Sequence, residues 1–329
     1  MQSVVVTGGS GKAGRAAIRE LLDHGYAVMN VDVVPPERPL CHFFKADLND
    51  LGQAVDALRQ AAGTIDRRRQ PLGTPTAVVH LAGIPAPGLA PDAVTFRNNM
   101  LTTHNVFSAA TLLGLERVVW ASSETAYGLP FTRVPPAFAP VTEEHPLAPE
   151  TGYALAKVLC ERMAREMHRW NPGTRFVGLR ISNIFEELDY ALIPSFWDDP
   201  RLRSWNLWSW VDSRDVAQAC RLALEADVPG DGCFTIAAAD TLMRRPSREL
   251  MAEFFPGVAV GPELGTFDTL LSIAEARRVL GYEPKHSWRT AAVETAPASR
   301  GAAGATTPGC GVTGSAHRRG TSSRAQRLR

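Results

Sequence analysis

The chain has 329 residues, 45% hydrophobic and 21% charged, which is typical of a globular protein and excludes a disordered or fibrous one. Lys and Arg total 35 against 34 Asp and Glu, so the net charge of +1 provides no global field for nucleic acid, and we expect no such partner. No apolar run approaches the roughly 20 residues of a spanning helix, and the N-terminus shows no secretion signal, so we expect no membrane partner and a cytoplasmic location.

Short β-branched runs alternate with longer helical patterns along the first 180 residues. Strands are expected at residues 3–7, 27–32, 42–46, 77–82, 117–122 and 175–179, with helices at 12–23, 51–61, 91–113 and 152–170. Continuous apolar runs such as Val4-Val5-Val6 are typical of strands that are buried on both faces. The pattern predicts an α/β fold with a doubly wound parallel sheet.

The alternation fades after the first domain, which we place at residues 1–180. Residues 181–210 and 237–295 are expected to form a small C-terminal substrate-binding lobe, while 211–236 returns to the first domain. Short helices are expected at 214–226, 247–255 and 272–280. The segment 296–329 contains six arginines and no acid, and we predict a disordered basic tail; a basic binding arm is the alternative, and we assign the tail no function.

A glycine-rich turn joins the first strand to the first helix. In the run Thr7-Gly8-Gly9-Ser10-Gly11-Lys12-Ala13-Gly14, Gly8 permits the tight turn, Gly11 lets the backbone approach a pyrophosphate, and Gly14 lets the helix lie close to the sheet. The phosphates would meet free N–H groups at the helix N-terminus, around Lys12 and Ala13. This context favours a Rossmann-type dinucleotide site over a simple turn.

Asp32 ends the next strand, 24 residues after Gly8. A carboxylate there would accept hydrogen bonds from the ribose hydroxyls and repel a 2′-phosphate, so NAD is favoured over NADP. Two alternatives stay open. Asp32 could be only a turn residue at the end of its strand. Lys12 or Arg15 could instead bind the 2′-phosphate of NADP.

Two further segments carry side chains suited to proton transfer. Tyr153 and Lys157 stand four residues apart on a predicted helix and therefore share one face. A tyrosine with a pKa of about 10 is a poor base at neutral pH, and a nearby ammonium lowers that pKa. Ser122 and Ser123 end a predicted strand at the edge where a cofactor's reactive end would lie, so a serine hydroxyl can hold a substrate oxygen against Tyr153. A solvated Tyr–Lys pair and a serine-capped turn are the alternatives.

At this point the sequence resembles the extended short-chain dehydrogenase/reductases, the NAD-dependent epimerase/dehydratase family, from about Gln2 to Arg289. The motifs that carry the resemblance, in order, are TGGSGKAG, Asp32, Ala46-Asp47-Leu48, His80-Leu81-Ala82-Gly83, Asn99, Ser122-Ser123 with Tyr127-Gly128, Tyr153 with Lys157, Leu179-Arg180 with Asn183, and Val211-Asp212-Ser213-Arg214-Asp215-Val216-Ala217.

The resemblance implies a role for each matching position. For the cofactor NAD it implies Asp47 and Leu48 at the adenine, Leu81, Ala82 and Gly83 along the ribose and pyrophosphate channel, and Asn99 as support from its helix. For catalysis it implies Ser123 as the catalytic Ser/Thr, Tyr153 as general base and Lys157 as a further ligand of the nicotinamide ribose, with Thr125 and Asn183 facing the substrate. It also implies a homodimer formed through the helices of Asn99 and Tyr153.

These readings converge on an oxidoreductase that acts on a secondary alcohol of a sugar or nucleotide sugar, in carbohydrate metabolism. Return of the hydride to the opposite face gives an epimerase, the reading we favour; release of NADH gives a sugar or uronate dehydrogenase. Dehydration is disfavoured because Glu124 lacks the acidic partner of the family's 4,6-dehydratases. A non-catalytic NAD-binding protein is the third reading, and the intact Ser123, Tyr153 and Lys157 argue against it.

The chain departs from the nucleotide-sugar epimerases after Asn183. The connection to Trp210 is short and contains Arg201 and Arg203 as its basic residues, which is similar to the compact uronate dehydrogenases. Its four tryptophans (Trp197, Trp205, Trp208 and Trp210) are interpreted as lobe core, with a sugar-binding wall as the alternative.

Three further features are interpreted as structural. His80 is read as a strand residue, and five widely spaced cysteines show no metal-ligand spacing, so we expect no metal and a reducing compartment. Asp215 is read as a helix-start carboxylate at least as readily as a functional one.

Overall fold

Seven parallel strands form the central sheet, in the order β10-β7-β5-β4-β1-β2-β3. The computed structural model describes residues 2–60, 74–228 and 230–291. The strands are β1 (Ser3–Thr7), β2 (Ala27–Asp32), β3 (His42–Lys45), β4 (Pro75–His80), β5 (Arg117–Ser123), β7 (Arg175–Ile181) and β10 (Cys233–Ile236). The predicted Rossmann-type doubly wound sheet is confirmed, and its order reverses between β1 and β4. In open α/β sheets, ligands bind at the carboxyl ends of the strands beside such a reversal.

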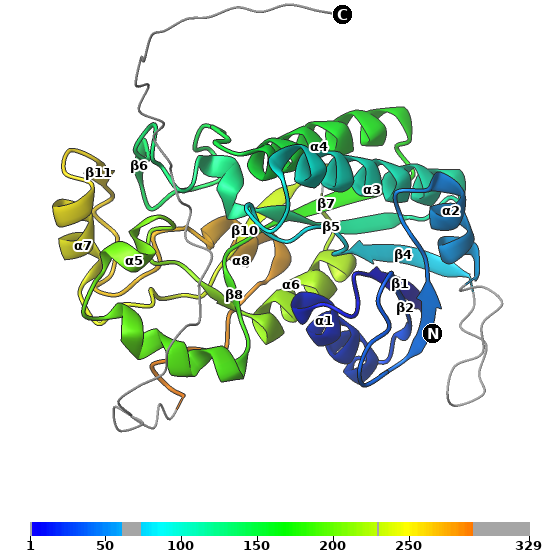
Figure 1. Ribbon diagram of the computed structural model, residues 1–329, viewed down its shortest axis with the longest axis horizontal. Helices are drawn as coiled ribbons and strands as arrows, with labels where there is room; N and C mark the ends of the chain where they lie inside the picture. Colours follow the sequence, from blue (N-terminus) through cyan, green and yellow to red (C-terminus); the bar gives the residue numbers. More distant parts are fainter. Residues whose placement is uncertain (1, 61–73, 229, 292–329) are drawn as a thin grey trace, which may run out of the picture. The chain divides into compact units, whose positions relative to one another are not determined.

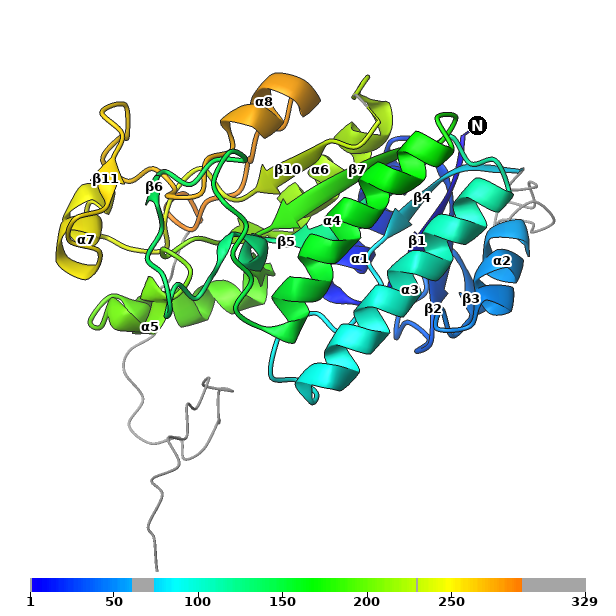
Figure 2. The same ribbon diagram turned by 90° about the horizontal axis from the view of Figure 1, so that it is seen from above.

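Helices cover both faces of this sheet (Figure 1). Helices α1 (Lys12–Asp23) and α6 (Ser213–Glu225) pack on one face, and α2 (Leu51–Gln60), α3 (Asp92–Leu112) and α4 (Gly152–Trp170) pack on the other. Figure 2 shows α3 and α4 running side by side. Alternate residues of β1 reach opposite layers, because Val4 and Val6 join the core under α1 while Val5 joins the core under α3.

The expected elements match the observed ones closely at β1, β2, α1 and α4. The fourth strand, expected at 77–82, ends at His80, so Leu81 and Ala82 belong to the following loop. Strand β10 was not predicted as a separate element; it pairs with β7 and extends the sheet. The expected tail at 296–329 lies outside the described residues.

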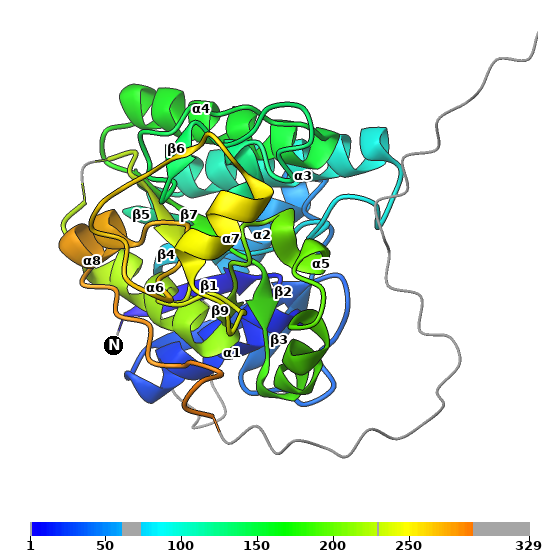
Figure 3. The same cartoon turned by 90° about the vertical axis from the view of Figure 1, so that its left-hand side faces the viewer.

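A second set of short elements lies outside the central sheet, and we call this set the lobe. Strand β8 (Ile184–Phe185) pairs with β9 (Val211–Asp212), and β6 (Phe138–Ala139) pairs with β11 (Ala259–Val260). The short helical segments are η2 (Glu124–Tyr127), η3 (Glu187–Phe196), α5 (Arg201–Ser204), α7 (Ser247–Phe254) and α8 (Ala274–Leu280). Elements η2, β6 and β9 belong to the lobe although they fall outside the residues predicted for a substrate-binding lobe. Figure 3 shows α5 and α7 in front of the sheet. The ion pair between Lys12 and Asp189 places η3 beside α1.

The lobe has an aromatic core. Trp208 and Trp210 are fully buried, and their indole N–H groups donate to the Pro200 carbonyl and to Asp240. Trp210 packs edge-on against Phe185 and Tyr190. The structure therefore uses these two tryptophans as core residues.

Asp215 anchors the last described segment to α6. Its carboxylate, which is fully buried, accepts the backbone N–H groups of Lys285 and His286 and contacts the His286 ring at 2.8 Å. This set of contacts agrees with the structural interpretation of Asp215.

Candidate active site

The glycine-rich turn after β1 is too tight for side chains. A Cβ on Gly8, whose φ is +71°, would lie 2.6 Å from the Ala82 nitrogen, and a Cβ on Gly14 would lie 2.1 Å from the Gly8 carbonyl oxygen. Gly11 is the N-cap of α1 and provides no side-chain cap, so the first N–H groups of the helix remain for a phosphate. The turn therefore fits the pyrophosphate of a dinucleotide.

Asp32 lies beside this turn at the end of β2. One carboxylate oxygen accepts the Ser10 N–H at 3.1 Å, and the other accepts the N–H groups of Val33 and Val34. The cations that sequence left as candidates for a 2′-phosphate both have acidic partners. Lys12 pairs with Asp189 at 2.6 Å and Arg15 pairs with Glu186 at 2.8 Å, so each of the two cations already has a carboxylate partner.

The loop after β4 lies beside the glycine-rich turn, on the other side of β1 from Asp32. Leu81 donates its N–H to the Thr7 carbonyl, and the Asn99 amide holds both backbone groups of Ile84, at 2.8 and 3.0 Å. Asn99 is buried and so fixes the loop that contains Ala82 and Gly83.

Asp47 and Leu48, the two residues implied at the adenine, differ in their exposure to solvent. Asp47 is exposed after β3, and its carboxylate accepts the Asn49 N–H. Leu48 is buried in the core between the sheet and α2, and its carbonyl accepts from Asn105. Leu48 therefore faces away from solvent, a direction that the motif by itself did not indicate.

Ser123, Tyr153 and Lys157 meet at the carboxyl ends of the strands. Ser123 closes β5, and its hydroxyl accepts a hydrogen bond from the Thr125 hydroxyl at 3.0 Å and lies beside the Tyr153 phenol, whose pKa it affects. Lys157 donates to the Ala121 carbonyl at 2.7 Å, and its ammonium lies 5.6 Å from the centre of the Tyr153 ring. All three side chains are buried.

Burial acts against the charged forms of this pair. It raises the pKa of Tyr153 to about 12, although the bond from Ser123 opposes the increase, and it lowers the pKa of Lys157. The Tyr153 shift is opposite to the one expected from the four-residue spacing. The reason is that the ammonium donates to Ala121 and not to the phenol, while desolvation penalises the phenolate.

Sequence reasoning missed a buried polar cluster beside this triad. It consists of Glu124, Ser182, Arg203 and Asn206. Ser182 donates to Glu124 at 2.6 Å, Asn206 donates to it at 3.3 Å, and burial raises the pKa of Glu124 to about 7. Arg203, buried among aromatic rings, donates to the side chain of Asn183 at 2.9 Å. No periodicity in the sequence links these residues, because Glu124 is 58 residues from Ser182 and 82 residues from Asn206.

A second missed group holds α4 to the sheet. Glu161 binds Arg180 through both carboxylate oxygens, at 2.9 and 2.7 Å, and accepts from Ser122 at 2.6 Å. Here a signal existed, because Tyr153, Lys157 and Glu161 follow one another at four-residue spacing.

The described residues contain neither a cluster of metal ligands nor a helix that could span a membrane. Within residues 2–60, 74–228 and 230–291, no three His, Cys, Asp or Glu side chains cluster as metal ligands. No helix in the same ranges is both long and apolar enough to span a bilayer. Burial lowers the pKa of His80 to about 3, and its ring bonds to Thr7.

The parallel sheet, its order and the glycine-rich turn after β1 define a dinucleotide-binding fold of the Rossmann type. More narrowly, the chain belongs to the NAD-dependent epimerase/dehydratase family, whose model matches residues 4–237, as the motifs predicted. NAD, the expected cofactor, is the cofactor of this family.

Several curated relatives are named UDP-glucose 4-epimerases. The chain is 29% identical over 197 residues to UDP-glucose 4-epimerase of Bacillus subtilis, covering 56% of this chain and 53% of that protein. It is 28% identical over 200 residues to UDP-glucose 4-epimerase 2 of rice, covering 56% and 45%. The matches thus span about half the length of these curated relatives.

Solved structures show the same fold over most of the chain. A short-chain dehydrogenase/reductase superfamily protein of Agrobacterium tumefaciens with bound NAD has a TM-score of 0.64 at 24% identity, covering 87% of this chain and 93% of that one. UDP-glucose 4-epimerase of Thermotoga maritima with UDP-glucose has a TM-score of 0.63 at 19% identity, covering 86% and 94%. A mutated uronate dehydrogenase has a TM-score of 0.60 at 19% identity, covering 88% and 83%.

Proposed function

We propose that this protein is an NAD-dependent epimerase that inverts a secondary alcohol of a sugar or nucleotide sugar. The observation that carries the proposal is the meeting of three buried side chains at the carboxyl ends of the strands: Ser123 at the end of β5, and Tyr153 with the Lys157 ammonium 5.6 Å from its ring centre. The UDP-glucose 4-epimerases among the relatives support the sugar substrate class.

Each residue of the triad has a distinct task. Ser123 holds the substrate hydroxyl, Tyr153 exchanges its proton, and Lys157 keeps a positive charge near the phenol. Bound NAD supplies the hydride chemistry. With a pKa of about 12, Tyr153 is protonated at neutral pH, so its action as a base requires a lower pKa in the loaded enzyme. A positive charge brought close to the phenol has that effect.

Removal of the phenol oxygen tests this assignment. We expect Tyr153→Phe to lower kcat by about 10²–10⁴-fold, the usual contribution of a positioned acid or base, while the fold is retained. The measurement is turnover on a panel of UDP-sugars and free sugars, with circular dichroism as the folding control. Turnover equal to that of the parent would falsify the role of Tyr153.

A sugar or uronate dehydrogenase is the second candidate. Its support is the likeness in fold to the uronate dehydrogenase and the short connection between Asn183 and Trp210. The two candidates differ in the fate of the hydride. Interconversion of sugar isomers without net absorbance change from NADH supports the epimerase, whereas accumulation of NADH with the same panel supports the dehydrogenase.

We also propose a homodimer formed through α3 and α4. These helices pack side by side, and their outer faces expose Val94, Leu101, Leu155 and Leu159, each about 40% accessible. Leu155 and Leu159 lie one turn apart, opposite the face that contains Tyr153. A second copy would cover these apolar side chains.

A further inference from the structure

Two ion pairs join the glycine-rich turn to the lobe. Lys12, the first residue of α1, contacts Asp189 at 2.6 Å, and Arg15, one turn later, contacts Glu186 at 2.8 Å. The partners are more than 170 residues apart in sequence. We call these two pairs the α1–η3 bridge.

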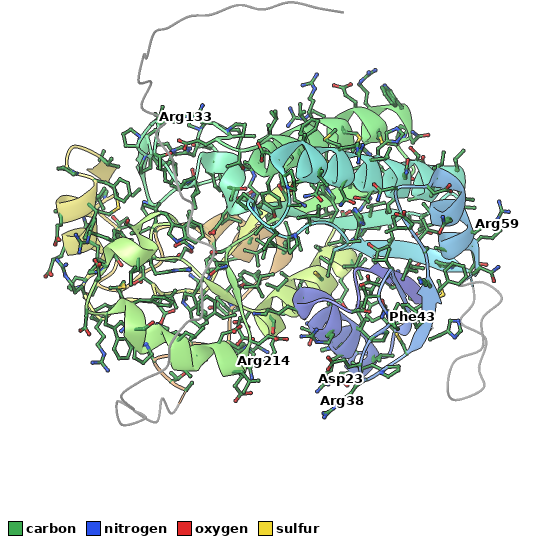
Figure 4. All side chains as sticks on the ribbon, viewed as in Figure 1. Asp23, Arg38, Phe43, Arg59, Arg133 and Arg214 are labelled. Carbon is green, nitrogen blue, oxygen red and sulfur yellow. The ribbon has the colours of Figure 1, made fainter. Side chains whose placement is uncertain are left out.

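The acidic side of the bridge is preorganised. Glu186 caps η3, and its side chain accepts the Asp189 N–H, while Asp189 accepts the Glu186 N–H at 2.7 Å. Tyr190 in turn donates to Asp212 at 2.7 Å and ties η3 to the start of α6. In Figure 4 the labelled Arg214 lies at that same start of α6, and it pairs with Glu187 at 3.8 Å. The carboxylates are therefore held in place before the cations meet them.

The basic residues of the bridge lie next to the glycine-rich turn, where we propose that the cofactor binds. Lys12 follows Gly11, whose turn has no room for side chains at Gly8 and Gly14. Arg15 donates to the Ser10 carbonyl at 2.9 Å, and Ser10 donates its N–H to Asp32. On one side the bridge therefore begins at the N-terminal end of α1, near Asp32. On the other side it ends at η3 in the lobe.

We infer that Glu186 and Asp189, through the α1–η3 bridge, hold the lobe against the glycine-rich turn and slow exchange of the dinucleotide. The inference rests on the proposed function and deepens it. An epimerase reuses one bound cofactor, whereas a dehydrogenase must release NADH at every turnover. A bridge that joins the lobe to the start of α1, next to the glycine-rich turn, favours retention of the cofactor.

The expected effect is moderate because the pairs are only half-buried. Their side chains are 29–48% accessible, and ion pairs of this kind each change an equilibrium by a small factor. Two pairs with preorganised acids lead us to expect a change of about three- to tenfold in the rate of release.

The test uses the full chain loaded with NADH and mixed rapidly with excess NAD, with release followed by nicotinamide fluorescence. The variant is Glu186→Gln with Asp189→Asn, which removes both charges but keeps hydrogen-bond acceptors for the η3 cap. It leaves Lys12 and the glycine turn, which belong to the proposed cofactor site, unchanged. The control is Glu283→Gln, which removes the partner of Arg277 in a comparable surface pair at 2.8 Å.

We expect the double variant to release NADH about three- to tenfold faster at low salt, and the control to release it at the parental rate. The difference should shrink at 1 M salt, where the Debye length is only about 3 Å. Unchanged or slower release in the double variant overturns the inference, as does equal acceleration in the control. A parent that binds no NADH overturns both the bridge and the cofactor assignment. Faster release in the double variant, together with a parent that turns over no sugar, supports the bridge and counts against the proposed reaction alone.

Discussion

Glu124 shows how far a single buried side chain can depart from its solution chemistry. Its carboxyl group is buried beside Ser123, and desolvation raises its pKa from 4.5 to about 7 despite hydrogen bonds from Ser182 and Asn206 and the charge of Arg203. The group therefore changes charge near neutral pH, next to the residue that we assign to substrate binding.

The raised pKa of Glu124 predicts a pH-dependent stability. Between pH 4.5 and 7 the folded state binds more protons at this site than the unfolded state, so stability falls as pH rises through that window. Relative to wild type, we expect Glu124→Gln to gain about 3 kcal/mol between pH 4 and pH 8, from about 1.4 kcal/mol per pKa unit. Urea unfolding at both pH values measures this difference.

His80 titrates with the opposite sign, but it is present in both proteins and cancels in the comparison. Parallel stability curves for wild type and Glu124→Gln would contradict the raised pKa of Glu124.

At the scale of elements, α4 is the helix that brings Tyr153 and Lys157, two of the three proposed catalytic residues, to Ser123. Lys157 ties the helix to β5 through the Ala121 carbonyl, and one turn later Glu161 ties it to Ser122 and to Arg180 on β7. The Glu161–Arg180 pair is about 10% accessible at each side chain, so it is shielded from solvent. These contacts fix α4 on β5 and β7 and so position Tyr153 next to Ser123 at the end of β5.

Loss of the Glu161 carboxylate should weaken the whole element. We expect Glu161→Ala to destabilise the fold by about 3–5 kcal/mol, because it leaves the Arg180 charge buried without its partner. Chemical denaturation provides the measurement. As a matched control, Glu166→Ala on the exposed face of α4 removes the partner of Arg162 and Arg169 and should change stability little. Equal effects of the two substitutions would refute the anchoring role.

At the scale of the whole molecule, the exposed leucines of α4 predict assembly. We expect the parent to sediment as a dimer at micromolar concentration and Leu155→Lys with Leu159→Lys to sediment as a monomer, because two charges on the proposed interface oppose its burial. Leu188→Lys is the control, since Leu188 is 90% exposed on η3, away from α4, and should leave the dimer intact. A monomeric parent would reject the proposed interface.

The sequence by itself determined the sheet, the glycine turn and the family. Gly8, Gly11 and Gly14 between a buried strand and a helix are a local pattern, and so are the four-residue spacing of Tyr153 with Lys157 and the apolar runs of the strands. Backbone geometry and side-chain periodicity act over a few residues, so such features can be predicted without the tertiary structure.

Only the tertiary structure decided the electrostatics and the long-range contacts. Desolvation raises the pKa of Tyr153, whereas the spacing suggested the opposite. The contact of Glu124 with Asn206 and the bridge from Lys12 to Asp189 join segments that no periodicity connects. Their partners depend on how the lobe packs on the sheet, and a buried charge interacts with whatever the whole fold brings beside it.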